Sequence, residues 1–82
     1  MNFQDILNKV CGDLSDNKAS KKLGVSRVMF SYYRNGHKMP SDETLDKMAE
    51  LSGLDPVQVY MAAYAEKVKN PRVAEAFRHL AA

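Results

Sequence analysis

The chain has 82 residues, of which 45% are hydrophobic and 27% are charged, and its formal net charge is +2. This length gives room for one domain with one core, and the hydrophobic fraction is too high for a disordered chain. No apolar run approaches the roughly 20 residues needed to span a bilayer, and the N-terminus lacks the features of a signal peptide. We therefore expect a single cytoplasmic domain with no membrane partner.

The basic side chains are concentrated in one part of the chain. Residues 15–40 carry six basic side chains against one acidic, whereas residues 1–14 and 41–82 each carry an acidic excess. A cationic patch on a nearly neutral body suits a polyanion that approaches from one side. On charge alone, a solvated helix face that happens to be basic is an equally good interpretation.

The first predicted helix follows Asn2, which can cap it, and ends at Gly12. Cys11, on its apolar side, is expected to be a buried small hydrophobe. Because it is the only cysteine, an internal disulfide is excluded and a reducing compartment is expected. The apolar residues that recur at the spacing of one helix face are Phe3, Ile6, Leu7, Val10 and Cys11.

Two short helices are predicted next, over about residues 16–23 and 27–34. Gly24 is expected to end the first of them, and Ser26 can cap the second. Ser20 is small and lies where the two helices would have to approach closely. The residues expected to point inward from this pair are Ala19, Leu23, Val25, Phe30 and Tyr33.

Three further helices are predicted after the turn at Asn35-Gly36 and the loop that follows it. Their start signals are Ser41, Asp55-Pro56 and Asn70-Pro71. The expected core residues are Leu45, Met48, Ala49 and Leu51, then Val57, Tyr60, Met61, Tyr64 and Val68, and finally Val73, Phe77 and Leu80. The chain is therefore predicted to be all-α, a compact bundle of five or six short helices.

The stretch from Asn17 to Gly36 has the spacing of a DNA-binding helix-turn-helix. The major groove of B-DNA is about 12 Å wide and admits one α-helix. A second helix that crosses the phosphate backbone holds the recognition helix at a fixed angle. This geometry needs a small residue and a glycine at the corner, and Ser20 and Gly24 supply them here.

The helix-turn-helix of the phage-repressor/Cro family is similar to residues 19–27 (ASKKLGVSR) and 31–36 (SYYRNG). Later parts of the pattern fit as well, and the resemblance covers roughly residues 3–60. It implies a lambda-repressor-like domain over residues 1–82, with the helix-turn-helix at 16–35. It also implies a homodimer that binds operator DNA. The helical extension at 56–81 is similar to that of small phage- and prophage-encoded regulators and is a candidate for dimerisation.

The resemblance also implies roles for particular residues. Arg27 suits guanine O6 and N7, and Val28 suits a thymine methyl group. The residues expected to reach base edges are Arg27, Val28 and Tyr32, followed by Met29 and Ser31. The residues expected to contact phosphates are Asn17, Lys18, Lys21, Ser26, Lys38 and Arg34, with His37 as a weaker candidate.

Two functions are compatible with these residues. The first is a sequence-specific transcriptional regulator of double-stranded DNA, a repressor of phage, prophage or bacterial origin acting as a homodimer on a palindromic operator. The alternative is a protein-interaction module, such as an anti-repressor or antitoxin. The apolar Val28, Met29 and Tyr32 favour that alternative, because clustered exposed apolar side chains often mark an interface.

Other chemistry has little support in the sequence. His37 and His79 lie far apart and share no ligand spacing with Cys11, so no metal or other cofactor is expected. No nucleophile–base arrangement or glycine-rich phosphate loop is present, so we expect no enzyme activity and no small-molecule ligand. The apolar stripes of the fifth and sixth helices could supply a two-fold interface, or the sixth helix could simply pack back on the first.

Overall fold

The computed structural model describes residues 1–81, which form six α-helices and contain no strand. The helices are α1 (Phe3–Cys11), α2 (Asp16–Leu23), α3 (Arg27–Asn35), α4 (Asp42–Ser52), α5 (Pro56–Lys67) and α6 (Pro71–Leu80). The prediction of an all-α bundle is confirmed. Within the described part of the chain, no helix has both the length and the apolar character needed to cross a membrane.

Each helix begins after a residue whose side chain caps it. At α1, the Asn2 side chain accepts a hydrogen bond from the Asp5 amide, and the Asp5 carboxylate accepts one from the Asn2 amide. This reciprocal capping box satisfies two backbone donors that the helix itself leaves free. The caps of the other helices are Ser15, Ser26, Ser41, Asp55 and Asn70.

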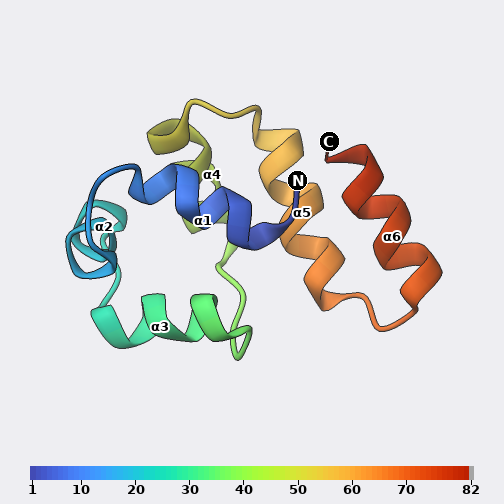
Figure 1. Ribbon diagram of the computed structural model, residues 1–82, viewed down its shortest axis with the longest axis horizontal. Helices are drawn as coiled ribbons and strands as arrows, with labels where there is room; N and C mark the ends of the chain where they lie inside the picture. The colour runs from blue at the N-terminus through green and yellow to red at the C-terminus, as the bar shows by residue number, and fades with distance from the viewer. Residues whose placement is uncertain (82) are drawn as a thin grey trace.

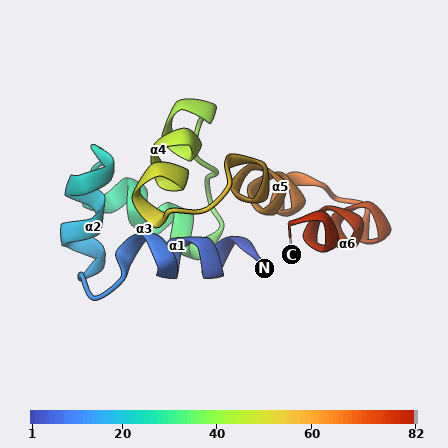
Figure 2. The same ribbon diagram turned by 90° about the horizontal axis from the view of Figure 1, so that it is seen from above.

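The bundle is elongated, with extents of 35 × 24 × 21 Å. Figure 1 shows α2 at one end of α1, α3 below α1, and α5 and α6 toward its other end. Seen from above, α5 and α6 lie side by side at one end of the molecule (Figure 2). Helix α1 packs against α2, α4 and α5, whereas α3 packs chiefly against α2. The outer face of α3 is therefore left uncovered.

The predicted core of the first four helices is confirmed with one exception. Leu51 is 38% exposed, because it lies on the outer side of the last turn of α4. Met48 and Ala49 occupy the inner side of that turn. The buried residues that the sequence predicted in these helices are Phe3, Ile6, Leu7, Val10, Cys11, Ala19, Leu23, Phe30, Tyr33, Leu45, Met48 and Ala49.

The predicted inward face of α5 is right for three of its five residues and wrong for Val57 and Val68. Val57 is 59% exposed and Val68 follows the helix, whereas the face that meets the other helices is formed by Val59, Ala62, Ala63 and Ala65. Three of these four are alanines, which let neighbouring helices approach closely. Tyr60, Met61 and Tyr64 lie beside this face and are half-buried against the core.

The two tyrosines of α5 tie it to α4. The Tyr60 hydroxyl donates to Asp46 Oδ1 at 2.6 Å, and the Tyr64 hydroxyl donates to Asp42 Oδ1 at 2.8 Å. The hydrogen bond to Asp46 raises the pKa of Tyr60 to about 12. The hydroxyls thus explain why these rings stay at the edge of the core, where a polar tip finds a partner.

The predicted inward face of α6 is wrong for two of its three residues, whereas the third, Phe77, is half-buried. Val73 is 43% exposed and Leu80 is 66% exposed, whereas Ala74 and Ala81 are buried. Among the described residues, helix α6 packs chiefly against α5. At this contact, Gln58 Nε2 donates to the Ala81 carbonyl at 3.2 Å.

Two leucines of α4 provide a matched test of this core. Leu45 is fully buried and Leu51 is 38% exposed. We expect Leu45→Ala to lower the free energy of unfolding by about 2–5 kcal/mol, because it leaves a cavity. Leu51→Ala should lower it by less than about 1 kcal/mol, because surface substitutions have small effects. Urea unfolding of both variants measures the difference, and equal losses would contradict this description of α4.

Candidate nucleic-acid interface

The corner between α2 and α3 depends on Gly24, which adopts a left-handed conformation with φ of 76°. Its amide donates to the Lys21 carbonyl at 3.1 Å, and the Val25 amide donates to the Ser20 carbonyl at 3.0 Å. These bonds satisfy carbonyls at the end of α2 and turn the chain sharply. A side chain at position 24 would make this conformation costly, since only glycine adopts it freely.

A small buried residue lets the two helices meet. Ser20 is 1% exposed, and its hydroxyl donates to the Asn17 carbonyl at 2.6 Å within α2. Ala19 beside it is completely buried. On the other side of the corner, Ser26 starts α3 by accepting a hydrogen bond from the Met29 amide at 3.0 Å. The α2–corner–α3 unit therefore coincides with the predicted range of residues 16–35.

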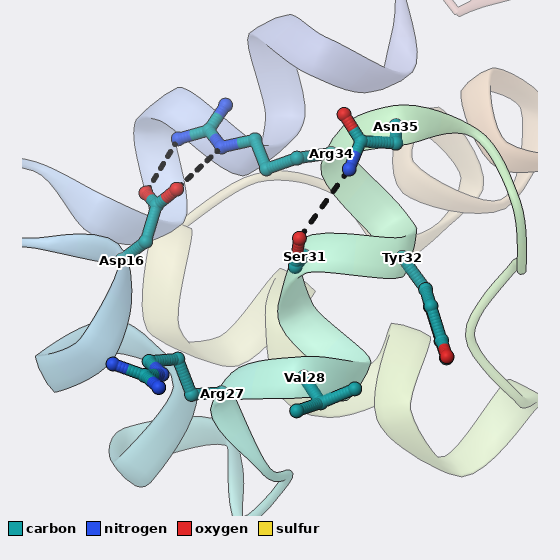
Figure 3. A pocket seen from close by; sticks show the side chains of 7 residues that line it. All are labelled: Asp16, Arg27, Val28, Ser31, Tyr32, Arg34 and Asn35. Carbon is teal, nitrogen blue, oxygen red and sulfur yellow. Dashed lines mark hydrogen bonds and ion pairs between the residues drawn. The ribbon is translucent and has the colours of Figure 1, made fainter.

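The uncovered face of α3 forms one side of an open groove of about 610 Å³. Val28 is 57% exposed there and Tyr32 is 37% exposed. Figure 3 shows that the side chains of α3 project into this groove from successive turns. Its lining residues are Asp16, Arg27, Val28, Ser31, Tyr32, Arg34 and Asn35. The groove thus gathers four of the five residues that the sequence assigned to base edges.

Met29 is the residue of that set which lies elsewhere. It was expected to be among the more exposed residues of α3, but it is partly buried and packs against the core. The reason is its position one residue before the buried Phe30, at the edge of the inward face. The exposed apolar patch therefore reduces to Val28 and Tyr32.

Tyr32 is joined to the loop that follows α3. Its ring meets the His37 ring edge-on, with the ring centroids 6.1 Å apart. Lys38 Nζ lies 5.5 Å from the centroid of the same ring, within the range of a cation–π contact. This contact places a positive charge beside Tyr32, which lines the groove.

Asn35 is a groove residue that the sequence analysis used only as a turn signal. Its Nδ2 donates to Ser31 Oγ at 3.3 Å, one turn earlier on the same face of α3 (Figure 3). The helical spacing is a signal that could have identified it, because Asn35 lies four residues after Ser31 and eight after Arg27. It adds an amide to the polar groups in the groove.

Arg34 has a different environment from the other basic candidates. Its Nη2 lies 3.1 Å from Asp16 Oδ1, and its Nε donates to Asp16 Oδ2 at 3.3 Å. These hydrogen bonds hold the pKa of the Asp16 carboxyl below its ordinary value of 3.8. Arg34 is therefore already paired within the protein.

The other residues predicted to contact phosphates are all exposed. They belong to α2, the cap of α3 and the loop after it, and they are not among the residues that line the groove. They are Asn17, Lys18, Lys21, Ser26 and Lys38. Among residues 1–81 no cluster of three or more His, Cys, Asp or Glu side chains is arranged to hold a metal ion. The surface formed by α2, α3 and the loop after α3 thus combines a hydrogen-bonding groove with exposed basic side chains.

Comparison with known protein families matches residues 12–59 to the helix-turn-helix family. This range is more than half of the chain and contains α2, α3 and α4 completely. Searches of curated proteins and of solved structures give no match.

The Asp16–Arg34 pair predicts how stability depends on pH. A carboxyl whose pKa is lowered by folding stabilises the protein above its unfolded pKa and loses that contribution as the pH falls. We expect Asp16→Asn to lower the melting temperature at neutral pH and to lower it much less well below pH 3.8. The effect should be small, since the Asp16 side chain is 52% exposed and solvent screens the pair.

Thermal unfolding across this pH range measures the effect. Asp13→Asn is the matched control, because Asp13 is exposed and makes no hydrogen bond or ion pair within residues 1–81. The same pH dependence in both variants would contradict a specific role for the pair.

Proposed function

We propose that this chain, which belongs to the Cro/C1-type helix-turn-helix family of DNA-binding regulators, is a sequence-specific transcriptional repressor of bacterial or phage origin. It binds double-stranded DNA as a homodimer on a palindromic operator. The observation that carries this proposal is the groove on α3, where exposed donors and apolar groups lie together beside a basic helix.

In this proposal α3 enters the major groove and α2 crosses the phosphate backbone. Lys18, Lys21 and Lys38 contact phosphates, which sets the position of the protein and makes its affinity depend on salt. Arg27 donates to guanine, and Val28 contacts a thymine methyl group. The protein acts by occupying DNA and not by catalysis.

The alternative role as a protein-interaction module rests on a smaller surface than the sequence suggested. Met29 turns toward the core, so Val28 and Tyr32 are the large apolar residues that α3 exposes. Tyr32 in turn lies beside His37 and Lys38. A polar, cationic setting of this kind favours a polyanion over an apolar protein surface.

Exposed apolar residues at the other end of the molecule support the homodimer. Val57, Val73 and Leu80 are all more than two-fifths exposed. Val57 also lines an apolar groove of about 300 Å³, together with Asp46, Pro56, Tyr60 and Met61. A two-fold contact through this region would leave both α3 helices free for DNA.

DNA binding is tested by selection from a random duplex pool, followed by titration of the enriched duplex across a salt series. We expect a palindromic motif whose affinity falls steeply with salt. Arg27→Ala should lose about 1–3 kcal/mol of preference for that motif, because contacts to base edges determine which sequence is bound. Lys21→Ala should weaken binding to all duplexes about equally and reduce the salt slope by about 0.9.

Arg27 and Lys21 are matched in charge and are both exposed, so the two variants separate base reading from charge. The interaction module would instead be favoured by three results together: no enriched motif, a strong effect of Val28→Ala on binding to a protein, and little effect of salt.

The homodimer is tested by two valines of nearly equal exposure, Val57 at 59% in α5 and Val28 at 57% in α3. We expect Val57→Ser to weaken self-association, because it removes apolar area from the proposed interface. Val28→Ser should leave self-association unchanged and weaken binding to the selected duplex. Sedimentation equilibrium and DNA titration measure the two properties. Self-association that is unaffected at Val57 would place the interface elsewhere.

A further inference from the structure

The ion pair between α3 and α2 is part of a larger junction at Arg34. On the side of α1, Arg34 Nη1 donates to Asn8 Oδ1 at 2.7 Å and to Gln4 Oε1 at 3.5 Å. Arg34 Nη2 also lies 3.4 Å from the sulfur of Cys11. Together with the two bonds to Asp16, these contacts engage all three guanidinium nitrogens.

Arg34 connects three helices through this junction. Asp16 is the first residue of α2, Gln4 and Asn8 belong to α1, and Arg34 lies in the last turn of α3. The guanidinium also lies over the Phe30 ring, 5.7 Å from its centroid. Its planar, multiply bonded geometry gives an arginine at such a site a specificity that a lysine cannot reproduce.

The junction lies at the end of α3 that is far from the corner, beside the buried Phe30 and Tyr33. Helix α3 packs chiefly against α2, and its first turn is held by the corner at Gly24. At its far end, the polar ties to α1 are those of Arg34 and a hydrogen bond of 3.3 Å from Gln4 Nε2 to the Tyr33 carbonyl. These ties therefore limit rotation of α3 about the corner.

Small rotations of α3 have large consequences for base contacts. A helix of nine residues is about 13 Å long, so a tilt of about 10° about the corner displaces its far end by about 2 Å. That displacement exceeds the tolerance of a hydrogen bond. Ser31, Tyr32 and Asn35 lie in the half of the helix that moves most.

We propose that Arg34 is a positioning residue of the DNA interface: paired with Asp16 and bonded to α1, it fixes the angle of α3 and thereby determines sequence preference without contacting phosphate. This inference rests on the proposed function. A phosphate contact would require Arg34 to leave its partners and would leave the Asp16 carboxylate unpaired in the groove. The sequence alone grouped Arg34 with the phosphate contacts, so the two roles make opposite predictions.

The test compares Arg34→Met, Asp16→Asn and the double variant. Each is titrated with the selected duplex and with a scrambled duplex of the same composition, across a salt series. Circular dichroism first establishes a temperature at which every variant is folded. The measured quantities are the ratio of the two affinities and the slope of affinity against salt.

We expect each single variant to lower the affinity ratio about tenfold, near the low end of the cost of one wrong base pair. The double variant should be no worse than the more affected single variant, because both substitutions break the same junction. The salt slope should stay that of the wild type, since no phosphate contact is lost. Asp16→Asn separates the two roles more sharply than Arg34→Met. It makes the net charge of the protein more positive, yet we expect it to lower the preference for the selected duplex.

Arg78→Met is the matched control. This substitution also removes one positive charge and breaks an ion pair, the one between Arg78 and Glu75 at 3.0 Å. Arg78, however, lies on α6. Its affinity ratio and salt slope should match those of the wild type. A loss of preference in this variant equal to that of Arg34→Met would overturn the inference, because charge alone would then explain the effect.

Two other results would also overturn it. The first is a salt slope that falls by about 0.9 in Arg34→Met, with Asp16→Asn unaffected, which would make Arg34 a phosphate contact. The second is an unchanged affinity ratio in Asp16→Asn, which decides the matter even if Arg34→Met fails to fold. A wild-type protein without any preferred duplex would reject the proposed function itself and the inference with it.

Discussion

The helix-turn-helix of this protein depends on the close approach of α2 and α3 at Gly24. Two helices can meet this closely only where the residues between them are small and the chain can turn within a few residues, which Ala19, Ser20 and the left-handed Gly24 allow. Because α3 is held mainly by α2 and by the corner at Gly24, α1 and α4 can lie behind these two helices and leave the outer face of α3 uncovered. At the far end of α3, the buried Tyr33 and the polar contacts of Arg34 and Gln4 hold the helix to α1 and the core.

The parts of the fold that were predicted from sequence are those encoded locally. Asn2, Ser26 and Ser41 mark helix starts because a capping side chain acts on amides two or three residues away. The apolar periodicity of α1 identifies its buried face because that helix is polar on its other side. For the same reason the sequence predicts four of the residues that α3 places in the groove, Arg27, Val28, Ser31 and Tyr32, and their contacts with DNA are part of the proposed function.

The remaining features depend on distant neighbours. Helix α5 carries apolar residues around much of its circumference, so periodicity does not identify the buried side, and the alanines that form it carry little hydrophobic signal. Helix α6 was assigned its larger apolar residues as core, whereas packing against α5 selects Ala74 and Ala81. Arg34 and Asp16 are 18 residues apart, and no local rule pairs them. The position of Arg34 in a basic segment favoured an external role, and the acidic residue that neutralises it lies on another helix.

The burial of Cys11 gives the protein a built-in reporter. It is the only cysteine of the chain, it is 6% exposed, and its sulfur lies where α1, the start of α2 and Arg34 meet. Burial raises the pKa of this thiol. In the folded state the sulfur is therefore shielded from solvent, and the reactive thiolate form is disfavoured. Labelling by a thiol reagent therefore requires this junction to open. The rate of labelling follows the local unfolding of α1, α2 and α3, and no engineered probe is needed.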